Sequence, residues 1–416
     1  MADDKQMTGK IGGCFKECMM TKRMAGSVLG SLVLAFAWFT MFAVSPSAQT
    51  AISDKADNPF KLASIEAGGK LRLAMVLGTR VIDIDAANQH LVQQAKVARV
   101  AIPGEMKALI EQYKTVSPRL YQIANYFKTN STANLPFAWD ADKVSYKAPI
   151  KYPWNVLAAA ANYKAHAVGM GASGGQPAPS PAAGAAAAPA ASGAPGAPAG
   201  GGGFNAAAAA LIVPDRDAPI MFAKSPRSCI IDPGEPYYIV DGRQRTDYEG
   251  EVAIIMGPRP AYRVPREQAH DYVFGYSIMH DLSDRGSDKL REVSMFPGVN
   301  WFDGKSTDRC APFGPVIVPK EFLTKAPANL HIVTKVNGEV RQDGNTSEFI
   351  WDEAHLVGYL TSRLTLYPGD VISSGTPAGT GAELNKFLKA GDVVTIEVEG
   401  IGMLTTPFKL LSEKPR

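Results

Sequence analysis

The sequence has few cysteines, little excess charge and no basic cluster. Only four of the 416 residues are cysteine, and the formal net charge is +3. Cys14 and Cys18 have no later Cys or His pair at metal-ligand spacing, so a zinc site is not expected. No basic stripe alternates with aromatic residues, which argues against a nucleic-acid partner. Hydrophobic residues make up 46% of the chain, which is enough for one large globular domain or two.

The N-terminus has the three parts of an export signal. Lys22 and Arg23 precede an uncharged apolar stretch over residues 24–44, and small residues suited to cleavage follow at 45–51. Residues 1–48 are therefore expected to be a signal peptide of an exported, periplasmic protein. The apolar stretch is long for a signal. An uncleaved membrane anchor facing the periplasm is the alternative, and it is the only membrane contact expected.

The two remaining cysteines lie far apart in the sequence. In an oxidising compartment Cys229 and Cys310 could form a disulfide. Two free buried thiols are the alternative, and the sequence leaves both open.

The N-terminal part of the mature chain has its own pattern. Residues 49–68 are expected to be a loose segment. Residues 71–77 and 80–84 flank a Gly-Thr turn and predict a β-hairpin. Apolar residues then recur at helical spacing over 85–128. We expect a small N-terminal α/β region over residues 49–150.

A low-complexity segment interrupts the main domain. Residues 171–210 contain Gly, Ala, Pro and Ser without any charge, so they cannot bury enough apolar surface to offset their chain entropy. We expect a flexible insertion there. Because it begins shortly after His166, it could be a lid, and an inert surface insertion is the alternative.

From residue 219 onward, short apolar segments separated by turn residues predict a strand-rich domain. Helical patterning is rare, apart from residues 352–364. The fold class expected is α+β, predominantly β, with a rolled or sandwiched sheet in a domain over 151–412. The clearest predicted strands are residues 236–240, 252–256, 316–318, 330–336 and 393–398.

Three carboxylates are the most informative residues. Glu249 and Glu251 lie in an expected strand over 247–255, and residues two apart in a strand point to the same face. Asp281 ends a second apolar segment, 276–281. Two buried like charges need a cation, and three carboxylates suit Mg²⁺, Mn²⁺ or Ca²⁺. A solvated outer face is the alternative.

Four more side chains, His166, Arg285, Lys305 and Thr376, join these carboxylates as candidates. With them the chain resembles the fumarylacetoacetate hydrolase family. The matching segments occur in the family's order over most of residues 70–408. They are Asn162-Tyr163-x-x-His166, Asp247-Tyr248-Glu249-x-Glu251, His280-Asp281-x-x-x-Arg285, Gly304-Lys305-Ser306, Gly314-Pro315, Val336-Asn337-Gly338-Glu339-Val340-Arg341-Gln342, Leu366-x-Pro368-Gly369-Asp370-Val371-Ile372, Gly375-Thr376-Pro377-x-Gly379 and Gly391-Asp392-x-Val394.

The resemblance implies a mixed β-sandwich roll, usually as a homodimer. It also implies Mg²⁺, Mn²⁺ or Ca²⁺ held by Glu249, Glu251 and Asp281. The implied substrate is a small 2-oxo acid or 1,3-dicarbonyl acid whose oxygens chelate the ion.

The residue chemistry agrees with this resemblance. A metal acting as a Lewis acid stabilises an enolate, and Lys305 could stabilise the same charge. His166 could act as general base toward water, and Thr376 could offer substrate a hydroxyl and a backbone N–H. Arg285 could bind a substrate carboxylate, with a structural ion pair as the alternative. Tyr163 joins it as a substrate-binding candidate.

Two positions depart from the family pattern. The glutamate usual three residues after the histidine is here Gly169, so His166 lacks that partner unless Asp215 or Asp217 replaces it. A glutamine often found after the metal aspartate is here Asp288. The first departure puts water activation in question.

The reaction expected is hydrolysis of a C–C bond in an acylpyruvate-like acid through a metal-stabilised enolate. Isomerisation, decarboxylation or dehydration of a 2-oxo acid at the same metal site is one alternative. A metal-bearing oxo-acid-binding protein without turnover is another.

Overall fold

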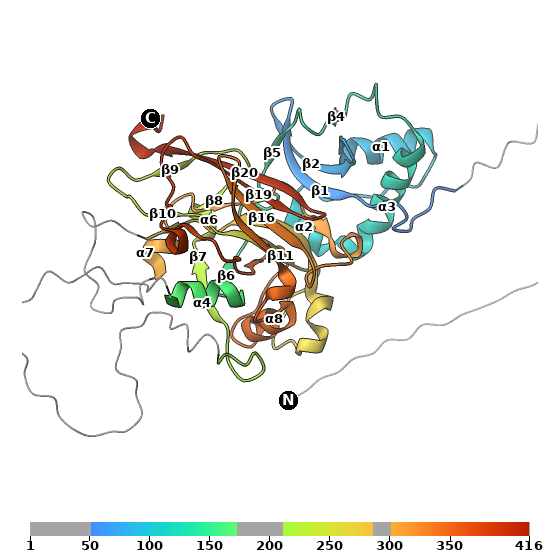
Figure 1. The fold of residues 1–416 in the computed structure, drawn as a ribbon. Coiled ribbons are helices and arrows are strands. Elements are labelled where there is room, and N and C mark those ends of the chain that lie inside the picture. The colour runs from blue at the N-terminus through green and yellow to red at the C-terminus, as the bar shows by residue number, and fades with distance from the viewer. Residues whose placement is uncertain (1–50, 173–210, 286–300, 416) are drawn as a thin grey trace, which may run out of the picture. The chain divides into compact units, whose positions relative to one another are not determined.

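Three β-sheets contain most of the strands in the computed structural model (Figure 1). The structure describes residues 51–172, 211–285 and 301–415. The signal or anchor predicted over 1–48 and Asp288 lie outside these ranges. So does most of the predicted insertion, although α4 (Lys164–Ala172) extends two residues into it. No helix in the described ranges is long and apolar enough to cross a membrane.

The first sheet is N-terminal, with strand order β4-β3-β2-β1-β5. The antiparallel pairing of its strands β2 and β3 confirms the predicted hairpin. The prediction of a loose segment over 49–68 was wrong for residues 61–67, because β1 pairs with β2 along its whole length, while residues 51–60 contain no helix or strand. Leu62, Ala63 and Ile65 in β1 are fully buried, and that burial stabilises the strand. The strands are β1 (Lys61–Ala67), β2 (Lys70–Leu77), β3 (Arg80–Asp83), β4 (Ala138–Asp140) and β5 (Ser145–Lys147).

The helical pattern predicted over 85–128 is confirmed in part. It forms α1 (Ile84–Gln94), α2 (Met106–Glu111) and α3 (Tyr113–Thr129), with no helix over 95–105. The side chain of Asp83 begins α1 by accepting hydrogen bonds from two backbone N–H groups of its first turn. Helix α1 packs against β2 and α3 (Figure 1).

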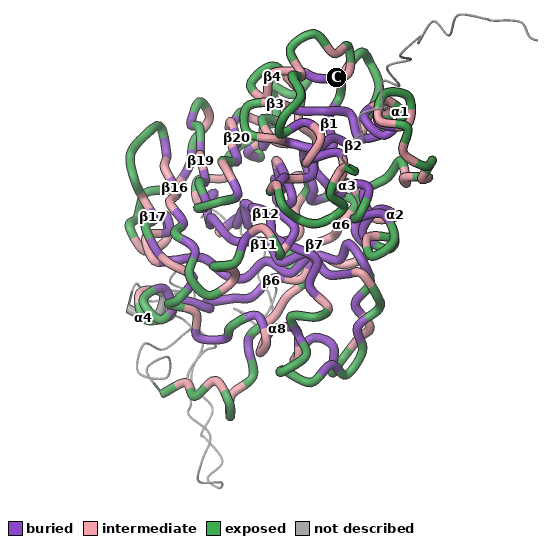
Figure 2. Tube along the Cα trace, turned by 90° about the vertical axis from the view of Figure 1, so that its right-hand side faces the viewer, coloured by how far each residue is buried: buried purple, intermediate pink, exposed green. Residues whose placement is uncertain are grey.

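The second sheet is mixed and carries the candidate site, with strand order β15-β12-β11-β18-β6-β7. Every residue of β11 and β12 is buried, and Figure 2 shows both strands inside the molecule. Strand β11 pairs antiparallel with β12 and β18, whereas β18 runs parallel to β6. The strands are β6 (Val156–Ala160), β7 (Ile220–Lys224), β11 (Gly250–Met256), β12 (Val273–His280), β15 (Val318–Pro319) and β18 (Val371–Ser373).

The third sheet has strand order β17-β16-β19-β20-β9, and two small pairs, β10–β13 and β14–β8, complete the strands. All five clearest predicted strands exist, although residues 316–318 only overlap β15. The new strands here are β8 (Ile230–Ile231), β9 (Tyr237–Ile239), β10 (Thr246–Asp247), β13 (Ser283–Asp284), β14 (Ala311–Pro312), β16 (His331–Val336), β17 (Glu339–Asn345), β19 (Val393–Val398) and β20 (Gly402–Leu410).

Short helices connect these sheets. The predicted helix over 352–364 is α8, and it packs against η1. The α-helices are α6 (Pro226–Cys229), α7 (Trp301–Lys305), α8 (Glu353–Thr361) and α9 (Gly381–Leu384). The 3₁₀ helices are η1 (Arg266–Tyr272), η2 (Lys320–Phe322), η3 (Thr346–Glu348) and η4 (Leu411–Glu413). The predicted α+β class with predominant β-structure is confirmed.

The N-terminal sheet and the later sheets share one hydrophobic core. Leu62 of β1 and Ile317, just before β15, exchange two backbone hydrogen bonds of 2.8 Å. The two regions are therefore joined by main-chain bonds as well as by side-chain packing. A domain boundary at residue 150 stays a prediction.

Candidate metal centre

The three predicted carboxylates converge at one end of the β11–β12 pair. Glu251 is the second residue of β11, and Asp281 directly follows β12. The expected continuous strand over 247–255 was wrong, because Glu249 lies in the break between β10 and β11. The backbone N–H of Asp281 donates to the carbonyl of Glu249 at 2.9 Å, which holds the two residues together across that break.

The carboxylates are close enough to share one ion. Each offers an oxygen such that the three oxygens lie within 4.8 Å of one another, and all three residues are buried. Two oxygens bound to one Ca²⁺, each at about 2.5 Å, are at most about 5 Å apart. The spacing is therefore compatible with a hard divalent cation. The alternative of a solvated outer face does not hold for these residues.

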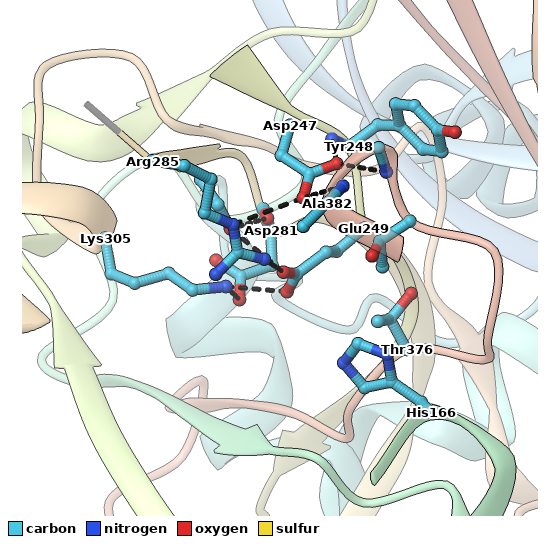
Figure 3. Close-up of polar contacts among 12 residues, drawn as sticks. His166, Asp247, Tyr248, Glu249, Asp281, Arg285, Lys305, Thr376 and Ala382 are labelled. Carbon is cyan, nitrogen blue, oxygen red and sulfur yellow. Dashed lines mark hydrogen bonds and ion pairs between the residues drawn. The ribbon is translucent and has the colours of Figure 1, made fainter. Parts of the chain in front are cut away.

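Three cationic side chains form ion pairs with the cluster, and Figure 3 labels two of them, Lys305 and Arg285. The ammonium of Lys305, at the end of α7, lies 2.6 Å from Glu249 Oε2 and 2.6 Å from Asp281 Oδ2. Arg285 donates to Glu249 and, at 3.2 Å, to Asp247. Lys224, the last residue of β7, is fully buried and lies 2.5 Å from Asp281 Oδ1.

Lys224 was not among the predicted site residues. Its only sequence signal is a charge ending the apolar run of β7.

Glu251 differs from the other two carboxylates because no lysine or arginine of the described residues forms an ion pair with it. Its Oε2 accepts hydrogen bonds from the Ser373 hydroxyl at 2.5 Å and from the Gly375 N–H at 2.9 Å. Its Oε1 is buried and has no hydrogen-bond partner within the described ranges. Burial, reinforced by the charges of Asp281 and Glu249, raises the pKa of Glu251 well above its ordinary value.

Counting formal charges shows what the cluster lacks. Four buried carboxylates, counting Asp247, face three cations among the described residues, and the carboxylate without an ion pair is Glu251. An unpaired buried carboxylate is costly, and a cation relieves that cost. The unsatisfied Oε1 of Glu251 therefore fits the place of a metal ligand. A divalent cation there matches the oxygen donors present.

The pKa of Glu249 is shifted in the opposite direction to that of Glu251. Burial raises its pKa, but Lys305 and Arg285 outweigh burial and hold it below its ordinary value. The charge of His166 acts in the same direction, so His166 belongs to the same site (Figure 3).

His166 has a carboxylate partner that sequence reasoning missed. Its Nδ1 lies 3.0 Å from Oε1 of Glu383 in α9, and the side chains are 5% and 9% exposed. The suggestion that Asp215 or Asp217 replaces the family glutamate was wrong. Asp215 contacts Arg266 and His355, and Asp217 contacts Arg216.

Gly169 makes room for this pair. A Cβ atom at position 169 would lie 2.4 Å from Oε1 of Glu383, which is closer than real Cβ contacts. A side chain at 169 would therefore require the Glu383 carboxylate to move from the position in which it contacts His166. Burial raises the pKa of Glu383, but the hydrogen bond and charge of His166 lower it below its ordinary value.

Asp247 positions the helix that carries Glu383. Its Oδ1 accepts from the N–H of Gly381 at 2.5 Å and its Oδ2 from the N–H of Ala382 at 3.1 Å, at the start of α9 (Figure 3). The same carboxylate accepts a hydrogen bond from Arg285. One buried aspartate thus connects the acidic cluster to the helix beside His166.

Thr376 and Tyr163 are buried at the same site. The Thr376 hydroxyl donates to the Gly250 carbonyl at 2.9 Å and accepts from Gln342 at 2.7 Å, so its hydroxyl is already engaged within the protein. The Tyr163 hydroxyl has no hydrogen-bond partner in the part of the chain that is described. Burial, together with Glu251, raises its pKa well above the ordinary value. Their roles toward substrate stay predictions.

Arg285 is used structurally, as the alternative reading of the sequence allowed. Its ion pairs with Asp247 and Glu249 occupy part of the guanidinium, while 23% of its side chain stays exposed. Carboxylate binding by the remainder stays a prediction.

Comparison with known proteins decides the family. The model of the fumarylacetoacetate (FAA) hydrolase C-terminal domain matches residues 155–409. The chain belongs to the fumarylacetoacetate hydrolase family. The match begins close to the predicted domain start at residue 151 and contains every predicted site residue.

Solved relatives of this fumarylacetoacetate hydrolase family protein agree with its fold. A fumarylacetoacetate hydrolase from Exiguobacterium antarcticum is 26% identical, with a TM-score of 0.58, covering 84% of this chain and 99% of that one. A 5-carboxymethyl-2-hydroxymuconate delta-isomerase from Mycobacterium smegmatis is 26% identical, with a TM-score of 0.53, covering 86% and 100%. The relatives are enzymes of two reaction types.

A relative from Staphylococcus epidermidis, itself uncharacterized, is 42% identical over 168 residues, which is 40% of this chain and 53% of that protein. The chain thus spans about half the length of the curated relatives it matches. The family and its enzymatic character are shown by these similarities, while the reaction is not.

Proposed function

We propose that this protein is a divalent-metal-dependent hydrolase that cleaves a C–C bond in an acylpyruvate-like acid or another 2-oxo or 1,3-dicarbonyl acid. The observation that carries the proposal is the 3.0 Å contact between His166 and Glu383 beside the acidic cluster. Hydrolysis needs a base for water, whereas isomerisation does not. A histidine oriented by a carboxylate is suited to that role.

The cofactor proposed is Mg²⁺, with Mn²⁺ or Ca²⁺ as alternatives. Glu249, Glu251 and Asp281 would hold it, because their buried oxygens converge and Oε1 of Glu251 has no hydrogen-bond partner among the residues that the structure describes. When bound, the ion supplies Lewis-acid polarisation of the substrate's oxo groups.

The protein's own residues supply the proton transfers. With Nδ1 of His166 donating to Glu383, Nε2 is left to accept a proton from water. The water oxygen bonds to the carbonyl carbon, the C–C bond breaks, and its electron pair stays on the 2-oxo fragment as an enolate. Lys305 places a positive charge beside this site, and the enolate is released after taking up a proton. One water thus gives a carboxylic acid and a 2-oxo acid.

Other residues would recognise the substrate. Arg285 keeps part of its guanidinium exposed and would bind the substrate carboxylate. Tyr163 brings a buried hydroxyl that has no hydrogen-bond partner in the described ranges, and Thr376 contributes its backbone in a glycine-flanked turn. We further propose that the protein is exported and acts as a homodimer.

The alternatives are a water-independent isomerase, decarboxylase or dehydratase, and a binding protein without turnover. The relative named as an isomerase is the observation that favours the first of these alternatives. Isomerisation consumes no water, so His166, the base that Glu383 orients, would have no water to activate.

Product analysis tests the proposal. Purified protein with Mg²⁺ or Mn²⁺ is incubated with a panel of acylpyruvates, and the products are identified by NMR. Two acids per substrate are expected, and a single organic product would contradict hydrolysis. H166N should lose turnover yet keep its metal-dependent rise in melting temperature. No turnover by wild-type protein, with oxo acids raising its melting temperature only in the presence of metal, would favour the binding protein.

A further inference from the structure

Two buried thiols contact each other close to the chain segment that carries Lys305 of the candidate metal centre. Strands β8 and β14 pair in parallel, with Ala311 opposite Ile230. The residues immediately before them, Cys229 and Cys310, are therefore neighbours. Their Sγ atoms lie 3.3 Å apart, and both side chains are free thiols buried from solvent.

The thiols contact the chain segment that carries Lys305. Sγ of Cys310 lies 3.2 Å from the carbonyl oxygen of Lys305, and Sγ of Cys229 lies 3.5 Å from that of Thr307. Lys305 ends α7, and its ammonium bridges two carboxylates of the acidic cluster. The sulfur pair thus lies against the main chain that positions a residue of the site.

The surroundings make the two sulfurs chemically unequal. Burial raises the pKa of the Cys310 thiol, but the neighbouring Cys229 thiol and the Lys224 ammonium outweigh it and lower that pKa below its ordinary value. The contact with Cys310, together with burial, raises the pKa of the Cys229 thiol. A pair of one activated and one protonated thiol is what disulfide formation in two steps requires.

We propose that Cys229 and Cys310 form a reversible dithiol–disulfide site, oxidised by hydrogen peroxide, whose state controls how firmly α7 is held. The inference does not depend on the proposed reaction. The sulfurs need to approach by only about 1.3 Å to reach bonding distance.

The oxidation is balanced by the peroxide alone. The Cys310 thiolate bonds to one peroxide oxygen, the O–O bond breaks, and the released hydroxide takes up the thiol's proton to give water. The sulfur of Cys229 then attacks the sulfenic sulfur, the S–O bond breaks, and a second water leaves with the Cys229 proton. Two thiols lose two electrons, and one peroxide becomes two waters.

The two sulfurs also contact the carbonyls of Lys305 and Thr307, at 3.2 Å and 3.5 Å. Drawing the sulfurs together into a disulfide would displace them from these carbonyls, and the main chain that ends α7 would lose that packing. Oxidation should therefore loosen α7 without unfolding the sheets.

Mass spectrometry of the full chain tests the site. Protein reduced with dithiothreitol is treated with hydrogen peroxide and digested without reduction. The expected result is a peptide pair linked through Cys229 and Cys310, lighter by two hydrogen atoms and restored by dithiothreitol. Unmodified thiols, a sulfinic acid at either residue, or cross-links confined to Cys14 and Cys18 would overturn the proposal.

Hydrogen exchange tests the consequence. Amides over residues 301–307 should exchange several-fold faster in the cross-linked protein, with recovery on reduction. C310S cannot form the disulfide, so peroxide should produce neither cross-link nor faster exchange in this variant. Unchanged exchange in fully cross-linked wild-type protein would refute the coupling to α7, whether or not C310S folds.

Discussion

The carboxylate of Glu383 lies 3.0 Å from Nδ1 of His166, although 217 positions of sequence separate them. Gly169, one turn beyond His166 in α4, leaves the space that this carboxylate fills. The pair supplies by tertiary contact what the family pattern usually supplies within one helix.

Replacing Glu383 should therefore impair proton transfer. Glu383→Gln is expected to lower kcat by about 10²-fold, toward the low end of what general-base catalysis contributes, with little change in KM. Steady-state kinetics on an acylpyruvate that the wild-type protein turns over measures this. Full turnover by E383Q would show that the contact between His166 and Glu383 is not needed for catalysis.

Moving the carboxylate provides the matched control. The double variant G169E/E383A places it at the usual family position and removes the atom that a Cβ at 169 would contact. Turnover should recover at least in part relative to E383A. The single variant G169E should be poorly stable, because both carboxylates then compete for one space. A double variant no more active than E383A would argue that Glu383 has only a structural role.

The same pair predicts how stability depends on pH. The pKa of Glu383 is below its ordinary 4.5 in the folded protein, so the unfolded chain binds its proton first as pH falls. The stabilisation is present above pH 4.5 and is lost as pH falls through the folded pKa. The difference in melting temperature between wild type and E383Q should narrow below pH 4.5. If the difference in melting temperature widened in acid instead, the pKa of Glu383 would be raised in the folded protein rather than lowered.

Glu251 is expected to control metal-dependent stability. In Glu251→Gln an unpaired buried carboxylate becomes neutral, so the metal-free protein should be as stable as wild type or more so. Saturating Mg²⁺ or Mn²⁺ stabilises wild type by about 2.7 kcal/mol at 100 times Kd, and E251Q should lose this gain. Differential scanning fluorimetry reads both effects.

Glu353→Gln is the control for this experiment. Glu353 is also buried but bonds to His270 and Tyr276, apart from the acidic cluster. E353Q should lower stability while keeping the metal-dependent gain. Equal metal-dependent gains in stability in E251Q and E353Q would show that Glu251 is not a metal ligand.

Lys305 should affect the apo protein and turnover in different ways. Lys305→Met removes the cation that bridges Glu249 and Asp281. Each carboxylate keeps one cationic partner, Arg285 or Lys224, but loss of the buried bridging charge still costs about 3 kcal/mol. A divalent ion should restore part of this loss, so the ion-dependent rise in melting temperature should exceed that of wild type. Turnover should stay absent.

The control variant K335M replaces a lysine whose side chain is 39% exposed. It should match wild type in its ion-dependent rise in melting temperature and in its turnover. If the ion-dependent rise in melting temperature were the same in K305M as in wild type, Lys305 and the ion would not be neutralising the same carboxylates.

Much of the local structure followed from the sequence because local patterns report local contacts. The β2–β3 hairpin, α8 and strands such as β11 and β19 were predicted from spacing and turn residues. Strand β1 was missed because its apolar residues become interpretable only once β2 pairs with them. The break at Glu249 was missed for a similar reason, since it depends on β10 pairing with β13.

By itself the sequence determined the family, the strand-rich class and the three metal-ligand candidates, because motifs keep their residue types and order along the chain. Only the tertiary structure decided that Glu383 partners His166, that Lys224 lies against Asp281 and that the two thiols touch. A solitary lysine or glutamate in a sequence resembles any surface charge. Its partner depends on which distant elements pack together, and hydrophobic burial over the whole chain determines that packing.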